Sequence, residues 1–576
     1  MTSSREATRA SSLSSQTFHD NDPMSLPIKD EAGTAVNEQH NPSDTKLSID
    51  TEKESQKDAP VESEENQYPT AMNLVFVVVA LILSMFLMAL DMTIIATAIP
   101  KITDEFKSLD QVAWYGSAFF LTLASFQSTA GKAYKYFPLK WTFLLSIFIF
   151  EVGSLICGVA PNSTALIVGR AIAGLGAAGI SSGVYIIIAF SAPPQQRPAL
   201  TGVLGATYSV ASVVGPLLGG VFTSDVSWRW CFYINLPIGA VSAAIIAFFF
   251  KVPPAAKPAT ASAKEKFLQM DPAGTVTILG AVICYLLALQ WAGVSKAWDD
   301  SEIIGLLVGF GLLVILFIGI EWYSGERALI PFRLMKDRNV AVCCAYVLFV
   351  VGPMFVMIYY LPIYFQSIKN VSASQSGVRN VPFILATSLT TVLSGVLITM
   401  YGHFVYLMIL AAVIETIGTG LIYTFAIDTG AGKWIGYQIL CGIGAGLGIQ
   451  IAIIVNQSSV DPSDISTVSA ATLFFQTIGG AFWVSAGESA FTNRLVQKLP
   501  EYAPGVNPAL VVSTGATELR SVFTAEQLPG ILEAYMSGLK VAFIVPIALG
   551  GVAAIISLFP KWVSLKGKID PGMGAA

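Results

Sequence analysis

The sequence has 576 residues, of which 54% are hydrophobic and only 12% are charged. Soluble domains carry about 25% charged residues, so this composition excludes an ordinary soluble protein and predicts a chain with many membrane spans. The net charge of −5 is unevenly distributed, because residues 1–71 hold six Lys or Arg against fourteen Asp or Glu. The rest of the chain shows no basic patch suited to nucleic acid.

Residues 1–71 are rich in Ser, Thr, Asp, Glu and Gln and contain almost no apolar clusters. Such a segment cannot bury enough surface to offset the loss of chain entropy, so we predict a disordered, acidic cytoplasmic tail. The first apolar run begins near Met72, which is too late for a secretory signal peptide.

From Met72 onward, apolar runs of about 20 residues alternate with short polar breaks, which is the pattern of membrane-spanning helices. We predict an all-α integral membrane protein with about fourteen transmembrane helices. Their predicted ranges are 73–96, 111–131, 141–160, 164–190, 200–222, 232–250, 274–293, 302–322, 340–366, 380–400, 403–426, 434–455, 468–491 and 537–558. A further short helix is expected near 526–535, within the long outer segment 492–536.

Lysine and arginine in the connections predict the orientation, because cytoplasmic loops are enriched in positive charge. With the N-terminus in the cytoplasm, the inner connections and the C-terminal tail hold fifteen Lys or Arg, whereas the outer connections hold ten. We therefore expect a multi-pass protein of the plasma membrane with both termini in the cytoplasm. A vacuolar or vesicle membrane is the alternative location.

Small residues recur at an offset of 268 positions. The Gly-Leu-Gly-Ala run at 174–177 matches the Gly-Ile-Gly-Ala run at 442–445, and the same offset sets Gly219 against Gly487. Chance recurrence in a glycine-rich chain is the alternative to a true repeat. The predicted domains are the tail 1–71, six-helix halves at 72–250 and 340–558, a linker 251–339 with two extra transmembrane helices, and a C-terminal cytoplasmic tail at 559–576.

The most specific pattern is the uncharged stretch 202–220, which is long enough to cross a bilayer as one helix. Ala211, Gly215 and Gly219 recur every four residues and form a groove of small residues on one helical face. Pro216 removes one backbone donor and is expected to bend the helix. The groove predicts that a neighbouring helix approaches closely. An ordinary tight contact in a membrane bundle is the simpler interpretation.

Ionisable residues inside membrane spans are costly, so each one is a candidate for function. Asp91 lies in the first predicted span, Glu151 in the third, Arg170 in the fourth and Glu415 in the eleventh. A buried carboxylate can take up and release a proton near neutral pH, and a nearby Arg holds it deprotonated. We interpret these four as candidates for proton coupling, with a static ion pair between helices as the alternative. For Asp91 and for Glu488, both near outer ends of spans, a solvated interfacial position is a further alternative.

Several of these patterns resemble motifs of the major facilitator superfamily, in its fourteen-helix drug:proton antiporter branch. The antiporter motif in helix 5 of that branch is similar to this chain at Gly202, Ala211, Gly215, Pro216, Gly219 and Gly220, with Ala211 where Gly is usual. Further resemblances lie at 90–100 in helix 1, 170–176 in helix 4, 228–237 at the turn into helix 6, and 271–274, 360–377, 434–438 and 515–520. Over nearly all of 72–558 the chain resembles fungal multidrug and mycotoxin efflux pumps.

The resemblance implies a monomeric secondary transporter that exports amphipathic small molecules in exchange for protons by alternating access. Helices 1 and 4 line the central cavity in the family fold, which implies Asp91 as the partner of Arg170 and leaves Glu151 as the alternative. The loop after helix 2 departs from the family pattern. Residues 131–140 carry Lys and Pro where an acidic residue and Gly are usual, which puts the charge-based lock of this loop in doubt.

Gln438, Gln450 and Asn456 are candidates for the wall of a cavity that suits amphipathic ligands. The expected partners are a small-molecule substrate, protons and the lipid bilayer, and no nucleic acid. No Gly-x-x-x-x-Gly-Lys phosphate loop is present and the three His are dispersed, so we expect no cofactor, no metal site and no enzyme. An importer of the same fold, such as a siderophore or nutrient permease, is the alternative function, and an integral membrane enzyme is a remote one.

Overall fold

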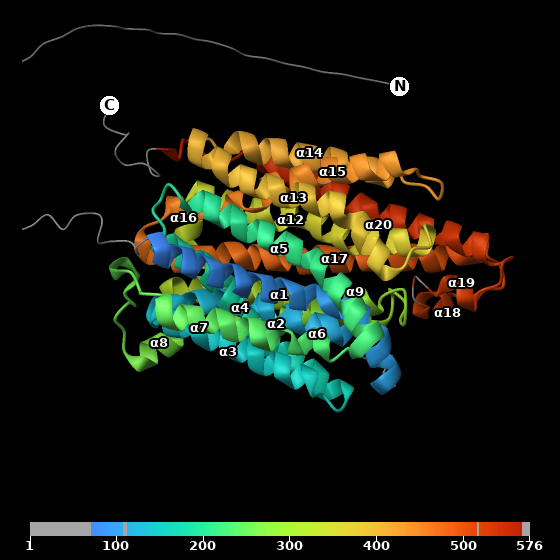
Figure 1. Cartoon of the computed structure of the whole chain (residues 1–576), viewed down its shortest axis with the longest axis horizontal. Helices are drawn as coiled ribbons and strands as arrows, with labels where there is room; N and C mark the ends of the chain where they lie inside the picture. Colours follow the sequence, from blue (N-terminus) through green and yellow to red (C-terminus); the bar gives the residue numbers. More distant parts are fainter. Residues whose placement is uncertain (1–68, 70, 107–111, 515, 517, 567–576) are drawn as a thin grey trace, which may run out of the picture. The chain divides into compact units, whose positions relative to one another are not determined.

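The computed structural model describes residue 69 and residues 71–106, 112–514, 516 and 518–566. The disordered tail predicted for 1–71 lies outside the described residues as far as residue 68. The described part consists of helices joined by short connections and contains no β-strand, as the sequence predicts for an all-α membrane protein (Figure 1).

Fourteen helices of fifteen or more residues make up most of the described chain. They are α1 (Ala71–Phe106), α2 (Val112–Tyr136), α3 (Leu139–Gly158), α4 (Ser163–Ser191), α5 (Arg197–Val221), α7 (Asn235–Phe249), α9 (Pro272–Trp291), α10 (Ser301–Ser324), α12 (Arg338–Ile363), α13 (Ala373–Tyr401), α14 (Val405–Tyr423), α15 (Ala431–Ile449), α17 (Ile465–Tyr502) and α20 (Leu528–Ile556). The shorter helices are α6 (Trp230–Tyr233), α8 (Ala263–Gln269), α11 (Phe332–Met335), α16 (Ile451–Ser459), α18 (Pro508–Ser513) and α19 (Leu519–Val522).

Polar caps determine where several of the long helices begin. Asn162, Asp300, Asp337 and Ser372 stand immediately before α4, α10, α12 and α13, and each side chain accepts a hydrogen bond from a backbone N–H of the first turn. Such caps satisfy donors that have no partner within the helix itself. The polar breaks of the sequence are therefore helix starts in the structure.

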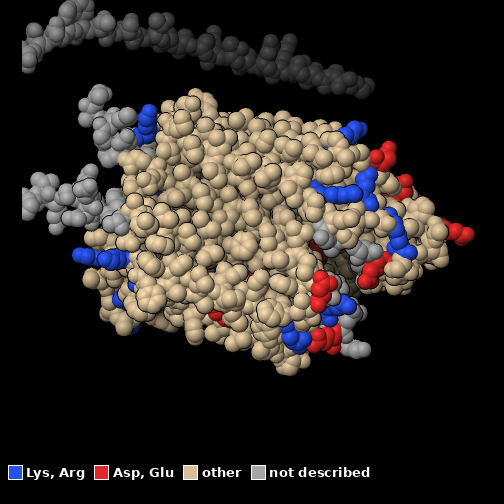
Figure 2. Space-filling view, viewed as in Figure 1, with Lys and Arg blue, Asp and Glu red and all other residues tan. Residues whose placement is uncertain are grey.

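Thirteen of the described helical segments are long and apolar enough to cross a membrane. The α2 helix has the same 25-residue length as α5 but is more polar, since it carries buried Gln127 and Lys132. With α2 included, the helices are consistent with the predicted fourteen spans. Figure 2 shows charged side chains gathered at two ends of one face, with a broad uncharged surface between them.

The helices pack in two groups that share one pattern of neighbours (Figure 1). In the first group, α1 packs against α5 and α7, and α4 packs against α2 and α3. In the second group, α17 packs against α12, and α15 packs against α13 and α14. The groups meet where α5 lies along α13 and where α2 lies along α17. The α9–α10 pair contacts both groups, because α9 packs against α2 and α17.

Glycines at equivalent places in the 268-residue repeat make equivalent contacts. A Cβ added at Gly176 of α4 would collide with the backbone of Phe150 in α3. A Cβ added at Gly444 of α15 would collide with the backbone of Glu415 in α14. Both glycines therefore let two helix backbones approach closely, which is the usual role of small residues in membrane bundles. The repeat is present in the packing as well as in the sequence.

The prediction of a separate short helix near 526–535 is wrong. The structure has a single helix, α20, that begins at Leu528, so the last span starts nine residues before the predicted position 537. Gly538 does not interrupt this helix, because its missing side chain allows close packing on Phe491 of α17. The tertiary contact overrides the weak helix propensity of glycine.

Candidate functional site

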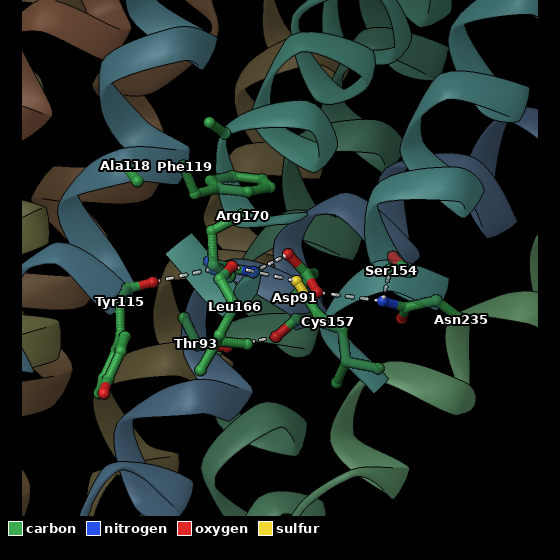
Figure 3. Close-up of polar contacts among 12 residues, drawn as sticks. Asp91, Thr93, Tyr115, Ala118, Phe119, Ser154, Cys157, Leu166, Arg170 and Asn235 are labelled. Atoms are coloured by element: carbon green, nitrogen blue, oxygen red, sulfur yellow. Dashed lines mark hydrogen bonds and ion pairs between the residues drawn. The ribbon is translucent and has the colours of Figure 1, made fainter. Parts of the chain in front are cut away.

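A buried ion pair joins the first and fourth helices. Arg170 of α4 donates a hydrogen bond from Nη1 to Oδ2 of Asp91 in α1, and both side chains are fully buried (Figure 3). The structure thus pairs Arg170 with Asp91 and not with Glu151, the alternative partner. A charge pair of this kind, away from water, is costly unless its remaining polar atoms are also satisfied.

The guanidinium of Arg170 is held from a second side by α2. Its Nε donates to the backbone oxygen of Tyr115 at 2.9 Å, and its Cζ lies 4.5 Å from the ring centroid of Phe119, where a cation–π contact forms. Its Nη2 has no hydrogen-bond partner among the described residues. The arginine therefore has one donor to spare, which allows it to exchange one acceptor for another.

The carboxylate of Asp91 is held from the opposite side by α7. Asn235 donates from Nδ2 to Asp91 Oδ1 at 3.0 Å and to Ser154 Oγ at 3.1 Å (Figure 3). Asn235 and Ser154 are both buried. Asp91 thus lies between the arginine of α4 and an amide of α7, and the amide N–H can hydrogen-bond to a carboxylate or to a neutral acid.

The small-residue groove of α5 packs directly onto α1, close to the ion pair. A Cβ at Gly215 would collide with Oγ1 of Thr93, two residues after Asp91. A Cβ at Gly219 would collide with Oγ1 of Thr97, one turn further along α1. The predicted close approach is therefore made, and the partner helix is the one that carries Asp91.

Other residues of the helix 5 motif lie in different surroundings. Gly202 faces α13, where an added Cβ would lie 2.9 Å from the backbone oxygen of Thr391. Ala211 is fully buried, and Pro216 lies inside α5. A Cβ added at Gly220 would meet no described atom within 4 Å.

The remaining carboxylate candidates are not brought to Arg170. The Glu151 carboxylate lies against Gly239 of α7, where an added Cβ would collide with Oε1. Glu415 of α14 is fully buried. Neither carboxylate has a hydrogen-bond partner among the described residues. Both stay candidates for proton uptake. Glu151 lies close enough to Asp91 for the two carboxylates to interact electrostatically, but neither Glu151 nor Glu415 forms a hydrogen bond with the ion pair.

A cavity of about 450 Å³ lies beside the ion pair, between the two helix groups. Gly116 and Phe120 of α2 line it, while the adjacent Tyr115 and Phe119 contact Arg170, so α2 separates the cavity from the ion pair. The other lining residues are Ile99, Ser117, Leu286, Gln290, Phe355, Tyr359, Tyr360, Ile363, Gly480, Ala481, Val484, Ser485, Glu488, Phe491, Thr492, Leu495, Val512 and Tyr535. Figure 2 shows a hollow at the end of the molecule where α18 and α19 lie.

A second cavity of about 50 Å³ continues the first toward the middle of the helices, since Phe120, Phe355 and Gly480 line both. Gln450 lines this smaller cavity and donates from Nε2 to the hydroxyl of Tyr185 at 3.1 Å. Of the three cavity candidates from the sequence, it is the one that lies at a described cavity.

The other two candidates for the cavity wall make internal contacts instead. Gln438 donates to the backbone oxygen of Arg379 at 3.1 Å, and Asn456 donates to Oγ1 of Thr472 at 2.8 Å. Both are fully buried and neither is among the residues that line the two cavities. Their amide nitrogens thus bond to neighbouring helices, while Oε1 of Gln438 and Oδ1 of Asn456 have no hydrogen-bond partner among the described residues.

Charged residues connect the two groups at the end opposite to α18 and α19. Lys135, at the end of α2, pairs with Asp464 just before α17, with Nζ 2.9 Å from Oδ1. Arg333 of α11 binds the other oxygen of Asp464 at 2.9 Å and also pairs with Glu326 at 2.9 Å. Lys132, buried in α2, donates to the backbone oxygen of Glu326 at 2.7 Å. Two of the lysines that the sequence suggests for the loop after helix 2 thus lie in the last turns of α2, where they form a charge network with Asp464 and with Arg333 and Glu326 of the linker.

Sequence patterns do not reveal the role of Asn235, the Lys135–Asp464 pair or the cavity-facing position of Glu488. Asn235 lies in the family-like stretch 228–237, but nothing in that stretch indicates its partner. The pair joins residues 329 positions apart. The one available signal is the unusual lysine content of 131–140, which by itself does not identify an acidic partner.

The model of the Major Facilitator Superfamily matches residues 81–484, which is well over half of the chain. This chain belongs to the major facilitator superfamily. The α1–α4 ion pair, the α5 groove and the cavity between the helix groups are thus features of a membrane transporter. The family and the relatives described next are transporters, so the chain is a transporter and not an enzyme.

Fungal proteins named as transporters are similar over most of the chain. The MFS-type transporter thnB of Trichoderma harzianum is 50% identical over 86% of this chain and 85% of its own. The probable efflux pump gsfJ of Penicillium aethiopicum is 48% identical over 87% of this chain and 90% of its own. The MFS-type efflux pump MFS1 of Arthroderma benhamiae is 46% identical over 87% and 94%.

Solved structures of the superfamily share the fold at low sequence identity. The human organic anion transporter MFSD10 matches with a TM-score of 0.53 and 13% identity, over 84% of this chain and 99% of that protein. The proton:xylose symporter XylE matches with a TM-score of 0.53 and 12% identity, over 86% and 98%. At this identity the likeness concerns the fold alone.

Proposed function

We propose that the protein exports amphipathic small molecules in exchange for protons by alternating access. The single observation that carries the proposal is the buried Asp91–Arg170 pair, separated from a ligand-sized cavity by α2. Ionisable residues inside a membrane protein mark ion or proton pathways by default. The naming of several close relatives as efflux pumps supports the outward direction.

In the proposed cycle, Asp91 is the group that takes up the proton. The neutral acid no longer holds Arg170, whose unpartnered Nη2 and contacts with α2 allow it to turn toward another acceptor. Asn235 stays within hydrogen-bond reach of the protonated acid. Loss of the proton restores the pair, so the proton gradient biases two arrangements of α1 and α4.

The helix 5 groove couples this change to the rest of the first helix group. Gly215 and Gly219 contact Thr93 and Thr97 of α1, while Gly202 contacts α13 of the second group. A movement of α1 near Asp91 therefore also moves α5, which packs against both α1 and α13 at the interface between the two groups. Close-packed interfaces of this kind move between discrete arrangements and do not deform gradually.

The two helix groups serve in this proposal as halves that rock against each other, at 72–250 and 340–558. The network around Asp464 holds them together at one end, and the 450 Å³ cavity lies toward the other. We propose that the network faces the cytoplasm, with both termini, and that the cavity releases substrate outward at the plasma membrane. The lysine-rich connections of the sequence support this orientation.

The test uses the purified protein in liposomes, with a fluorescent amphipathic substrate and an imposed pH gradient. Substrate movement opposite to the proton flow, abolished by a protonophore, is the expected result. Movement in the same direction as the protons would establish the importer. Substrate transport at the same rate with and without the pH gradient would show that transport is not coupled to protons.

A further inference from the structure

The described wall of the 450 Å³ cavity carries one negatively charged side chain and no positively charged one. Among the described residues that line it, Glu488 is the one acidic side chain, and there is no Lys, Arg or His. No hydrogen bond or ion pair of Glu488 is found within the described part of the chain, and its side chain is open to the cavity space. A carboxylate without a protein partner on a mostly apolar cavity wall is available to pair with a positive charge or a hydrogen-bond donor of a ligand.

The rest of the cavity suits an aromatic ligand. Six aromatic side chains line it, contributed by α2, α12, α17 and α20: Phe120, Phe355, Tyr359, Tyr360, Phe491 and Tyr535. Aromatic faces stack on flat ligands and attract cations. The volume of about 450 Å³ lies in the range of small-molecule sites.

Polar groups stand on the same wall as Glu488. Ser485 and Thr492 lie on α17 about one turn before and after it, and Gln290 of α9 reaches the cavity from the linker helices. These side chains can orient a ligand by hydrogen bonds, but none of them adds charge. Among the described residues that line the cavity, Glu488 is therefore the one that carries a charge.

We infer that Glu488 selects the ligand by charge. The cavity takes aromatic molecules that carry a positive charge or a hydrogen-bond donor, and it rejects carboxylates of the same size and shape. This inference rests on the proposed export function and specifies its substrate class. Like charges brought together between apolar cavity walls repel more strongly than in open solvent, so the Glu488 carboxylate disfavours a bound anion.

The test compares three fluorescent probes with the same naphthalene body and an amine, a hydroxyl or a carboxylate at one end. Equilibrium binding to the purified protein is measured by fluorescence titration, and pH-driven transport is measured in liposomes. We expect the amine to bind at least about tenfold more tightly than the carboxylate, which corresponds to about 1.4 kcal/mol. The hydroxyl probe should lie between them.

Glu488→Gln keeps the size of the side chain and removes its charge. We expect this variant to bind the hydroxyl probe as the parent does, to lose most of the preference for the amine, and to admit the carboxylate. Glu501→Gln is the matched control, because Glu501 lies on the same helix but outside the cavity lining and pairs with Lys498. The control should leave the ranking of the three probes unchanged.

An unchanged ranking in Glu488→Gln would overturn the inference, and so would a parent protein that binds none of the probes or prefers the carboxylate. The proposed export function fails separately. A parent that binds the probes in the predicted order but moves none of them on a pH step contradicts proton-driven export and leaves the charge selection in place.

Discussion

The helices α5 and α17 occupy equivalent places in the 268-residue repeat, yet they are built for different contacts. Gly215 of α5 lets the helix touch α1 beside Asp91. The equivalent residue of α17 is Trp483, whose indole N–H donates to the backbone oxygen of Leu348 in α12 at 2.8 Å. The neighbouring Val484, which stands where Pro216 would be, lines the cavity.

This difference indicates a division of tasks between the two helix groups. The first group holds the buried ion pair and the close α1–α5 contact. The second group supplies most of the cavity wall, including the acidic residue that faces it. In the proposed mechanism, the first group takes up the proton and the second group binds the ligand. The two groups are connected by α2, α5 and the charge network around Asp464.

The largest effect on stability is expected from breaking the ion pair. Asp91→Ala leaves Arg170 buried without a counter-charge, and loss of one partner of a buried pair costs about 3–5 kcal/mol. Glu415→Leu is the comparison in the second group, because Glu415 is equally buried but has no hydrogen-bond partner among the described residues. We expect this substitution to leave the free energy of unfolding almost unchanged or to increase it. Thermal unfolding of the purified variants measures both. Equal losses would show that the two groups do not differ in this respect.

Overfilling the helix 5 groove should have the next largest effect. Gly215→Leu places a branched side chain against Thr93, and overpacking costs about 1–3 kcal/mol. We expect a normally inserted protein with impaired or leaky export. Val210→Leu on the same helix is the control, because Val210 is an exposed residue of α5. If Gly215→Leu exported substrate as well as the parent, the groove would not be a coupling element.

Reversing the charges between the groups should have a smaller effect. Asp464→Lys places like charges beside Lys135 and Arg333, while a partly exposed pair is worth about 1 kcal/mol or less. We expect a few-fold loss of transport rate in liposomes and partial recovery in the double variant Lys135→Glu with Asp464→Lys. No recovery in the double variant would mean that the pair does not hold the groups together.

Removing residues 1–66 should have the smallest effect. The residues named above for the ion pair, the groove and the cavity all follow this acidic segment in the sequence. We expect unchanged turnover per molecule in liposomes, whatever happens to cellular abundance. A clearly lower turnover of the purified truncated protein would assign the tail a part in transport.

The fold and the site of the first helix group can be predicted from the sequence, because both depend on patterns among residues close together in the chain. Charges such as Asp91 and Arg170 are conspicuous inside apolar runs, and the small residues of α5 recur with helical spacing. The start of α20 is predicted too late, because the residues before 537 are assigned to an outer segment, whereas the helix begins at Leu528.

The second group's site could not be predicted in the same way. An amide or a carboxylate in an apolar helix does not indicate which neighbour it will face. Gln438 and Asn456 satisfy helix contacts, whereas Glu488, for which the sequence also allowed an interfacial position, faces the cavity. Which neighbour each of these side chains faces depends on how helices far apart in the sequence pack together, and this packing cannot be read from a single sequence.

The most direct test of the division of tasks is to separate ligand binding from proton drive in one variant. Arg170→Ala leaves Asp91 without its counter-charge, which favours the protonated acid, while the cavity wall is untouched. Arg170→Lys, which keeps the charge but not the planar fork, should retain partial function. In liposomes, Arg170→Ala should bind a fluorescent substrate as the parent does and fail to respond to an imposed pH step. Normal transport driven by the pH step would show that this arginine is structural and would contradict the account.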